Sequence, residues 1–167
     1  MNELHLFSKV KSKKLSGGRF ELRIKTNKQG ILSSLTDVGF GISQFLPIIV
    51  ADLQLSNNSV LTMSQPEIHL HPKIQASLGD YISRQIKLKS KQYIIETHSE
   101  YLLNRMRLQI VKGNISSEDV AVYYLNNSEN GTRIHNITFT KDGKILNAPK
   151  DFFDTYMMDV MNIALNA

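Results

Sequence analysis

Two polar segments of the chain carry residue types that bind and activate ligands in α/β proteins. Residues 63–72 read Met-Ser-Gln-Pro-Glu-Ile-His-Leu-His-Pro, and residues 94–99 read Ile-Ile-Glu-Thr-His-Ser; each ends an apolar run. If the two runs are neighbouring parallel strands, their carboxyl ends meet at one edge of the sheet, where such sheets bind ligands. The sequence therefore predicts that Gln65, Glu67 and His98 lie together on one rim.

A third segment, residues 37–44, combines two glycines with a serine and a glutamine in the order Asp-Val-Gly-Phe-Gly-Ile-Ser-Gln. Apolar residues at helical spacing follow it, so the glycines are expected at a helix N-terminus. Backbone amides at such an end, together with small residues, suit the close approach of a phosphate group.

Together the three segments resemble the C-terminal half of ABC-like ATPases of the overcoming-lysogenisation-defect type, which include many bacterial AAA ATPases. In that resemblance, residues 39–44 are the signature loop, residues 64–72 are Walker B and the D-loop, and residues 96–99 are the switch-histidine loop. The tail resembles a small C-terminal domain of unknown function found on a bacterial subset. The matching tail residues are Asp142, Gly143, Pro149, Phe152 and Phe153.

The resemblance implies that ATP and Mg²⁺ are the ligands, and it assigns two catalytic positions. Phosphoanhydride hydrolysis needs a held Mg²⁺, an oriented water and hydrogen-bonding groups around the γ-phosphate. Gln65 stands where relatives position the water, and His98 stands where an imidazole contacts the γ-phosphate. Ser64 replaces the acid of the magnesium shell and cannot supply a carboxylate, while Gln65 is a poor general base.

The resemblance also implies a set of nucleotide-contacting residues and a mode of assembly. In this family the signature loop of one subunit covers ATP held by an opposing subunit, which implies a head-to-tail homodimer. No side chain is assigned as a direct metal ligand. The implied nucleotide-contacting residues are Gly39, Gly41, Ser43, Gln44, Ser64, Glu67 and His71.

The phosphate-binding loop of such an ATPase is absent from these 167 residues. That loop is Gly-rich and ends in Gly-Lys-Ser or Gly-Lys-Thr, so that its amides and lysine hold the phosphates. Neither Gly17-Gly18 nor Gly39-Phe40-Gly41 is followed by Lys-Ser or Lys-Thr at the right offset. We therefore expect the chain to be inactive alone and to form only the closing half of a site, with an N-terminal ATPase half or partner supplying the rest.

The predicted fold class is α/β, a partial P-loop NTPase with a parallel sheet and flanking helices, followed by a small α+β extension. The pattern predicts an ATPase lobe over residues 1–125 and a hairpin-plus-helix extension over residues 126–167. Three strands at 60–63, 93–95 and 120–125 are expected to alternate with two helices in one parallel layer. A hairpin strand at 134–140 and a helix at 151–165 are expected to complete the extension.

Composition places few limits on the partners. The chain has 41% hydrophobic residues, no cysteine, and no apolar run near the length of a membrane span, which favours a cytoplasmic protein without membrane contact. Its net charge of +5 comes largely from the first thirty residues, where eight Lys and Arg residues face only Glu3 and Glu21. Such a cluster can attract nucleic-acid phosphate, although a solvated surface is the commoner explanation.

Two alternatives to the ATPase interpretation remain open from the sequence. One is a nucleic-acid or protein interaction module derived from an ATPase, which fits a family whose relatives often act with DNA or nucleases in phage defence. The other is a metal-dependent phosphohydrolase with a metal-activated water. Its ligands would come from Glu67, His69, His71, Glu96 and His98.

Overall fold

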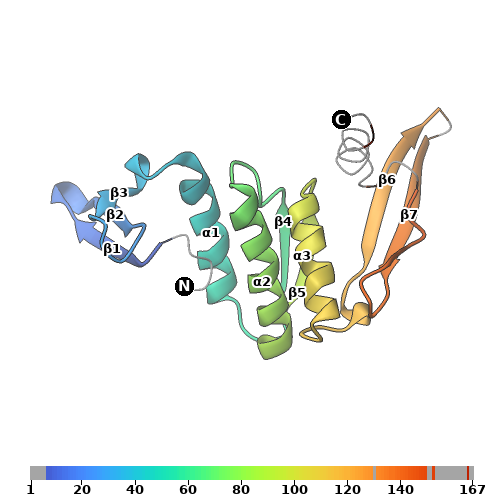
Figure 1. The fold of residues 1–167 in the computed structure, drawn as a ribbon. Coiled ribbons are helices and arrows are strands. Elements are labelled where there is room, and N and C mark those ends of the chain that lie inside the picture. The colour runs from blue at the N-terminus through green and yellow to red at the C-terminus, as the bar shows by residue number, and fades with distance from the viewer. Residues whose placement is uncertain (1–6, 130, 150–151, 153–164, 166–167) are drawn as a thin grey trace. The chain divides into compact units, whose positions relative to one another are not determined.

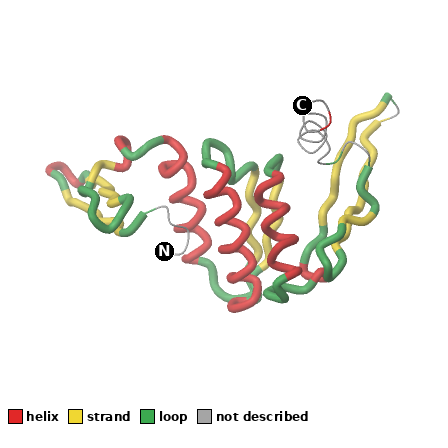
Figure 2. The backbone as a smooth tube through the Cα atoms, in the orientation of Figure 1, coloured by secondary structure: helices red, strands yellow, loops and turns green. Residues whose placement is uncertain are grey.

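The computed structural model describes residues 7–129, 131–149, 152 and 165. The chain forms two compact units, Met1–Met106 and Arg107–Ala167, and each is described by itself. Figure 1 shows the order of the elements and Figure 2 shows their type along the backbone. The units divide within a helix, whereas the sequence places a boundary after residue 125; the functional division of the chain stays a prediction.

The first unit begins with a three-stranded antiparallel sheet. Its strands are β1 (Lys9–Lys14), β2 (Phe20–Lys25) and β3 (Ser33–Ser34), with β2 in the middle. The turn between β1 and β2 is a short 3-10 segment, Ser16–Gly18, in which Gly17 and Gly18 have φ values of 70° and 74°. These left-handed angles favour glycine. The Leu-Ser-Gly-Gly-Arg sequence of residues 15–19 therefore forms a turn between β1 and β2.

A second layer of the first unit contains the parallel strands β4 (Val60–Ser64) and β5 (Gln92–Glu96). The helices around them are α1 (Phe40–Gln54), α2 (Pro72–Lys89) and the start of α3 (Glu100–Val111); a 3-10 turn, Leu35–Asp37, precedes α1. Proline at the first position of α2 suits a helix start, and Ser90, in the left-handed conformation with a φ of 50°, ends that helix. Strand, helix, strand, helix is the order that the sequence predicts.

The helices bury their apolar stripes on one side of the two-stranded sheet. Phe45, Ile49 and Leu78 are at most 2% exposed, and the Tyr81 hydroxyl of α2 donates to Asp52 of α1. On the opposite face, alternate residues of both strands are exposed, including Val60 at 51% and Ile94 at 62%. Within the described residues, this face of the parallel sheet therefore has no covering layer.

The second unit is built on an antiparallel hairpin. Strands β6 (Val122–Ser128) and β7 (Gly131–Phe139) pair in register, and β8 (Ile145–Leu146) adds to β7 after a turn at Gly143. The prediction that the strand at 120–125 extends the parallel sheet is wrong, because β6 pairs with β7 and not with β5. Its alternating exposure is typical of an antiparallel strand covered on one face only.

Two further features complete the description. A 3-10 turn, Ser117–Asp119, precedes β6 and begins with a capping box between Ser116 and Asp119. The helix predicted at 151–165 lies outside the described residues, apart from Phe152 and Leu165. The Phe152 ring makes an edge contact with Tyr124 at 5.4 Å between centroids. Among the described helices, none is both long and apolar enough to cross a membrane.

Candidate functional site

The carboxyl ends of β4 and β5 bring the two polar segments together, as the sequence predicts. Ser64 and Glu96 are paired across the strands, and the Ser64 hydroxyl donates a hydrogen bond of 2.7 Å to Glu96 Oε2. One residue further, the Gln65 amide donates to the Glu96 carbonyl oxygen at 2.8 Å. Ser64 and Glu96 are both exposed, so this end of the sheet presents a hydroxyl and a carboxylate to solvent.

The loop that follows β4 holds two residues in an uncommon backbone conformation. Gln65 has a φ of 45° and His69 a φ of 62°, both in the left-handed region. Two backbone hydrogen bonds form tight turns within the loop. The Ile68 amide donates to the Gln65 carbonyl oxygen, and the Leu70 amide donates to the Glu67 carbonyl oxygen. Non-glycine residues in this region cost about 1–3 kcal/mol each and cluster at binding and catalytic sites.

Glu67 ties the loop after β4 to the loop after β5. Its side chain is 6% exposed, and Oε1 accepts a hydrogen bond of 2.9 Å from the His98 amide. Its other oxygen, Oε2, is buried and has no hydrogen-bond partner among the described residues. The position of the His98 loop therefore depends on a carboxylate that the sequence assigns to nucleotide contact.

His98 and Ser99 have separate roles after β5. The Leu102 amide donates to Ser99 Oγ at 3.0 Å, so Ser99 caps the N-terminus of α3. Ser99 Oγ in turn donates to Gln75 Oε1 of α2 at 2.6 Å. His98 is exposed, so its imidazole is accessible to a ligand at the rim.

The two glycines at the start of α1 differ in what surrounds them. Gly39 is the N-cap of α1 with a φ of 95°, and a Cβ there would meet no atom within 4 Å. A Cβ on Gly41 would lie 2.6 Å from the carbonyl oxygen of His69. Gly41 therefore lets α1 pack against the loop after β4 of the same chain. This packing gives Gly41 a structural role that is separate from any contact with phosphate.

A shallow pocket lies between α1 and the loop after β4. Its volume is about 320 Å³, and residues from α1 and from the loop after β4 line it. Ser43, half-buried, lies in the first turns of α1 beside this pocket-lining segment. The lining residues are Gln44, Ile48, Ser64, Gln65, Pro66 and Ile68. Gln44, Ser64 and Gln65 of the same chain thus line one pocket.

The histidines of the loop do not form a metal centre in the described part of the chain. No three of its histidine, aspartate and glutamate side chains are placed to hold a metal ion. His71 is the N-cap of α2, and its Nδ1 accepts from the Lys73 amide at 3.3 Å. This geometry gives His71 a structural role and gives no support to a metal-dependent phosphohydrolase.

Sequence reasoning missed a buried charged cluster at the other end of β5. Lys91 and Asp52 form an ion pair at 3.1 Å in which both side chains are 1% exposed. Asp52 also accepts from the Tyr93 hydroxyl at 2.7 Å and from the Tyr81 hydroxyl. Burial opposes the charge on Asp52, but the tyrosine and lysine donors outweigh it and hold its pKa below the ordinary value. Burial and Asp52 together raise the pKa of Tyr93.

Two family models match the chain, one in each of its two compact units. A family model described as an AAA ATPase domain matches residues 2–103, and one described as a protein of unknown function (DUF3696) matches residues 115–163. No curated protein matches the chain.

Among solved structures, an SMC ATPase described for ATP-driven dimerization and DNA-stimulated activation has a TM-score of 0.60. Its sequence identity is 11%, with 97% of this chain and 84% of that chain covered, so it indicates a shared fold alone. The ATPase family model spans more than half of the chain, including both polar loops. The chain therefore belongs to the AAA ATPase domain family.

Proposed function

We propose that residues 37–99 form the signature, Walker B and switch half of a composite ATP site, which hydrolyses ATP when a phosphate-binding loop is supplied by another segment. The observation that carries this proposal is the rim at the ends of β4 and β5. There Ser64, Gln65 and Glu96 are joined by hydrogen bonds, and Glu67 fixes the backbone at His98.

The open sheet explains why another segment is required. Parallel sheets are normally covered on both faces, and a two-stranded sheet is marginal by itself. Here β4 and β5 pair only with each other among the described strands, and Val60 and Ile94 are exposed on the uncovered face. A strand that precedes a Gly-rich loop, followed by its helix, would extend this sheet and cover that face.

Glu96 can supply the carboxylate that relatives have at the position of Ser64. The two are paired across the strands, and the Glu96 carboxylate lies within hydrogen-bonding distance of the hydroxyl that replaces the usual acid. Oxygen donors from one carboxylate and a hydroxyl, completed by phosphate and water, fit Mg²⁺, which binds few protein ligands. Mg²⁺, when bound, would neutralise phosphate charge, and Glu96 with Ser64 would orient its water shell.

The remaining residues have roles that follow from their positions. Gln65, held in the left-handed conformation beside Ser64, orients the attacking water through its side-chain amide. The exposed His98 imidazole donates to the γ-phosphate, and Glu67 acts as a positioning residue through the His98 amide. Gly39 and Gln44 cover the nucleotide of an opposing subunit in a head-to-tail homodimer.

The experiment supplies the absent loop and varies the proposed magnesium-shell residue. The chain is combined with a segment that carries a strand and a loop ending in Gly-Lys-Ser or Gly-Lys-Thr, either on a second chain or joined at the N-terminus. Glu96→Gln is expected to raise the Mg²⁺ concentration at half-maximal ATP hydrolysis at least tenfold, because it removes the carboxylate. Glu100→Gln, in the first turn of α3, is the matched control and should leave it unchanged. An unchanged Mg²⁺ dependence in Glu96→Gln would refute the role of Glu96.

A further inference from the structure

The antiparallel sheet of the first unit gathers most of its charged side chains on one face; Lys14, paired with Phe20 on the other face, is an exception. Directly opposite residues in an antiparallel pair project from the same face. The register pairs Lys9 with Lys25, Lys11 with Arg23, and Lys13 with Glu21. Their side chains therefore share one face, which we call the basic face. Its members are Lys9, Lys11, Lys13, Glu21, Arg23 and Lys25.

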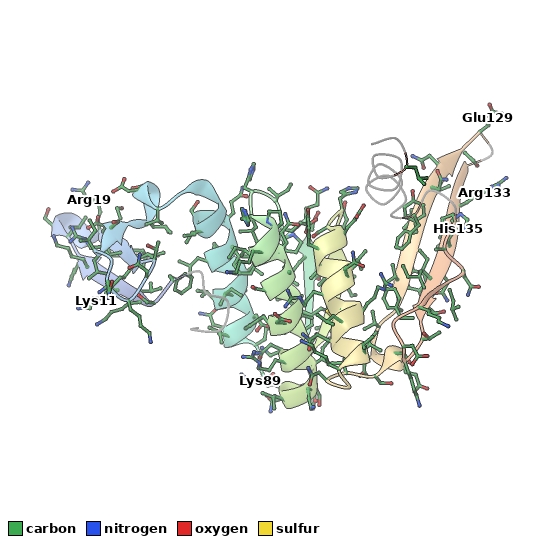
Figure 3. The ribbon with its side chains drawn as sticks, in the orientation of Figure 1. Lys11, Arg19, Lys89, Glu129, Arg133 and His135 are labelled. Atoms are coloured by element: carbon green, nitrogen blue, oxygen red, sulfur yellow. The ribbon has the colours of Figure 1, made fainter. Side chains whose placement is uncertain are left out.

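The positive charges of the basic face are mostly uncompensated. Glu21 is its only carboxylate, and the Arg23 Nε bonds to Glu21 Oε2 at 2.9 Å. The four lysines form no ion pair within the described part of the chain. Figure 3 shows the Lys11 side chain projecting away from the sheet. Four cationic side chains therefore remain available to a negatively charged partner.

Protection of a sheet edge does not explain this arrangement. Lysines on an edge strand such as β1 can prevent pairing with another chain. Arg23, however, lies on the middle strand β2 and is paired on both sides, with Lys11 of β1 and with Ser34 of β3. Placing Lys11 directly opposite Arg23, and Lys9 opposite Lys25, also destabilises the sheet by charge repulsion. A bound polyanion would offset that repulsion.

We propose that the basic face binds the phosphodiester backbone of a nucleic acid. Lysines that recur at alternate positions form a row about 7 Å apart, because each strand residue advances about 3.4 Å. The face carries no aromatic side chain on which a base could stack, since Phe20 projects from the opposite face. Binding is therefore by phosphate contacts and is independent of base sequence. This inference does not depend on the ATP site.

The test measures binding of the chain to fluorescent DNA duplexes across a range of salt concentrations. With about four phosphates neutralised, log K should fall against log salt with a slope of about −3.6 for duplex DNA. Two duplexes of equal length and different sequence should bind equally. The variant Lys9→Gln/Lys11→Gln/Lys13→Gln should bind at least tenfold more weakly at low salt, with a slope near −0.9.

A matched control removes the same charge elsewhere. Lys87, Lys112 and Lys141 are exposed lysines outside this sheet, and their triple glutamine variant should retain the original slope. Lys9→Gln and Lys11→Gln remove like-charge pairs, whereas Lys13→Gln removes an attraction to Glu21. Because these effects offset each other, the triple variant on β1 should unfold at about the same temperature as the original chain. Equal weakening by both triple variants would overturn the proposal, as would binding to anionic vesicles without binding to DNA, or no salt-dependent DNA binding at all.

Discussion

Glu67 links the two loops of the rim through a single hydrogen bond. Its buried carboxylate accepts from the His98 amide at 2.9 Å, so we predict that Glu67→Ala frees the loop after β5. The lost bond and the donor left unsatisfied should cost about 1–3 kcal/mol in the free energy of unfolding. Locally, hydrogen exchange at the His98 amide should accelerate at least tenfold.

Glu67→Gln is the matched variant, since its side-chain oxygen can still accept from His98. Protection of the His98 amide should persist in this variant, because shape and acceptor are retained. If the amide is equally protected in Glu67→Ala, the tie between the two loops is refuted.

Gly41 provides a second test at the scale of one residue. An alanine there would place its Cβ 2.6 Å from the His69 carbonyl oxygen, which belongs to backbone and cannot rotate away. We expect Gly41→Ala to destabilise the chain by about 1–3 kcal/mol, as overpacking does. Gly113→Ala is the control: it has open space and a φ of 68°, so it incurs only the backbone strain. If Gly41→Ala unfolds at the same temperature as the original chain, this packing is contradicted.

At the scale of elements, the Asp52 cluster joins α1, α2 and the segment that enters β5. Its ion pair with Lys91 is 1% exposed on both sides, so removing one charge leaves the other buried and unpaired. Asp52→Asn is expected to cost about 3–5 kcal/mol, as broken buried pairs do. The half-buried pair of Asp80 and Arg105, at 2.7 Å, is the comparison, and Asp80→Asn should cost less than Asp52→Asn, about 1 kcal/mol. Urea unfolding of both variants measures the difference.

The pH dependence of stability gives an independent check on the same cluster. The pKa of Asp52 is lower in the folded chain than its ordinary 3.8, so the folded state favours the ionised carboxylate. The stability this contributes is complete above the unfolded pKa and is lost as pH falls through the folded pKa. The unfolding free energies of the original chain and Asp52→Asn should therefore converge in acid. A constant gap between them down to pH 2 would contradict the lowered pKa.

The sequence predicts the elements around the rim well, for physical reasons that are local. Apolar spacing after residue 42 and after Pro72 fixes α1 and α2, and the short apolar runs before Ser64 and Glu96 fix the two strands. Because the loops directly follow those strands, their meeting at one edge is predictable as well.

The sequence did not determine which strands pair or which distant side chains meet. The strand after residue 120 has the composition of a sheet strand, but pairing with β7 across a short turn displaced the expected parallel arrangement. The cluster of Asp52, Lys91, Tyr81 and Tyr93 also escaped prediction, because its members are separated by up to 41 positions and show no common spacing.

At the scale of the whole molecule, the chain combines an AAA ATPase family segment with a second family segment of unknown function. The first carries the rim, the glycines at positions 39 and 41, and the basic face. The rim lies on a sheet that has one uncovered face within the described part of the chain, and the sequence contains no phosphate-binding loop. ATP turnover should therefore depend on a complementary segment, while DNA binding by the basic face should not.

The most direct test of the central claim is the rate of Mg²⁺-dependent ATP hydrolysis by the purified 167-residue chain, alone and with a loop-bearing segment. The chain alone is expected to hydrolyse no ATP above the buffer rate. With the segment, hydrolysis should appear, and His98→Ala should reduce it by at least a hundredfold, because the γ-phosphate contact is lost. Robust hydrolysis by the chain alone that His98→Ala abolishes would contradict the proposal that these residues form only half of the site.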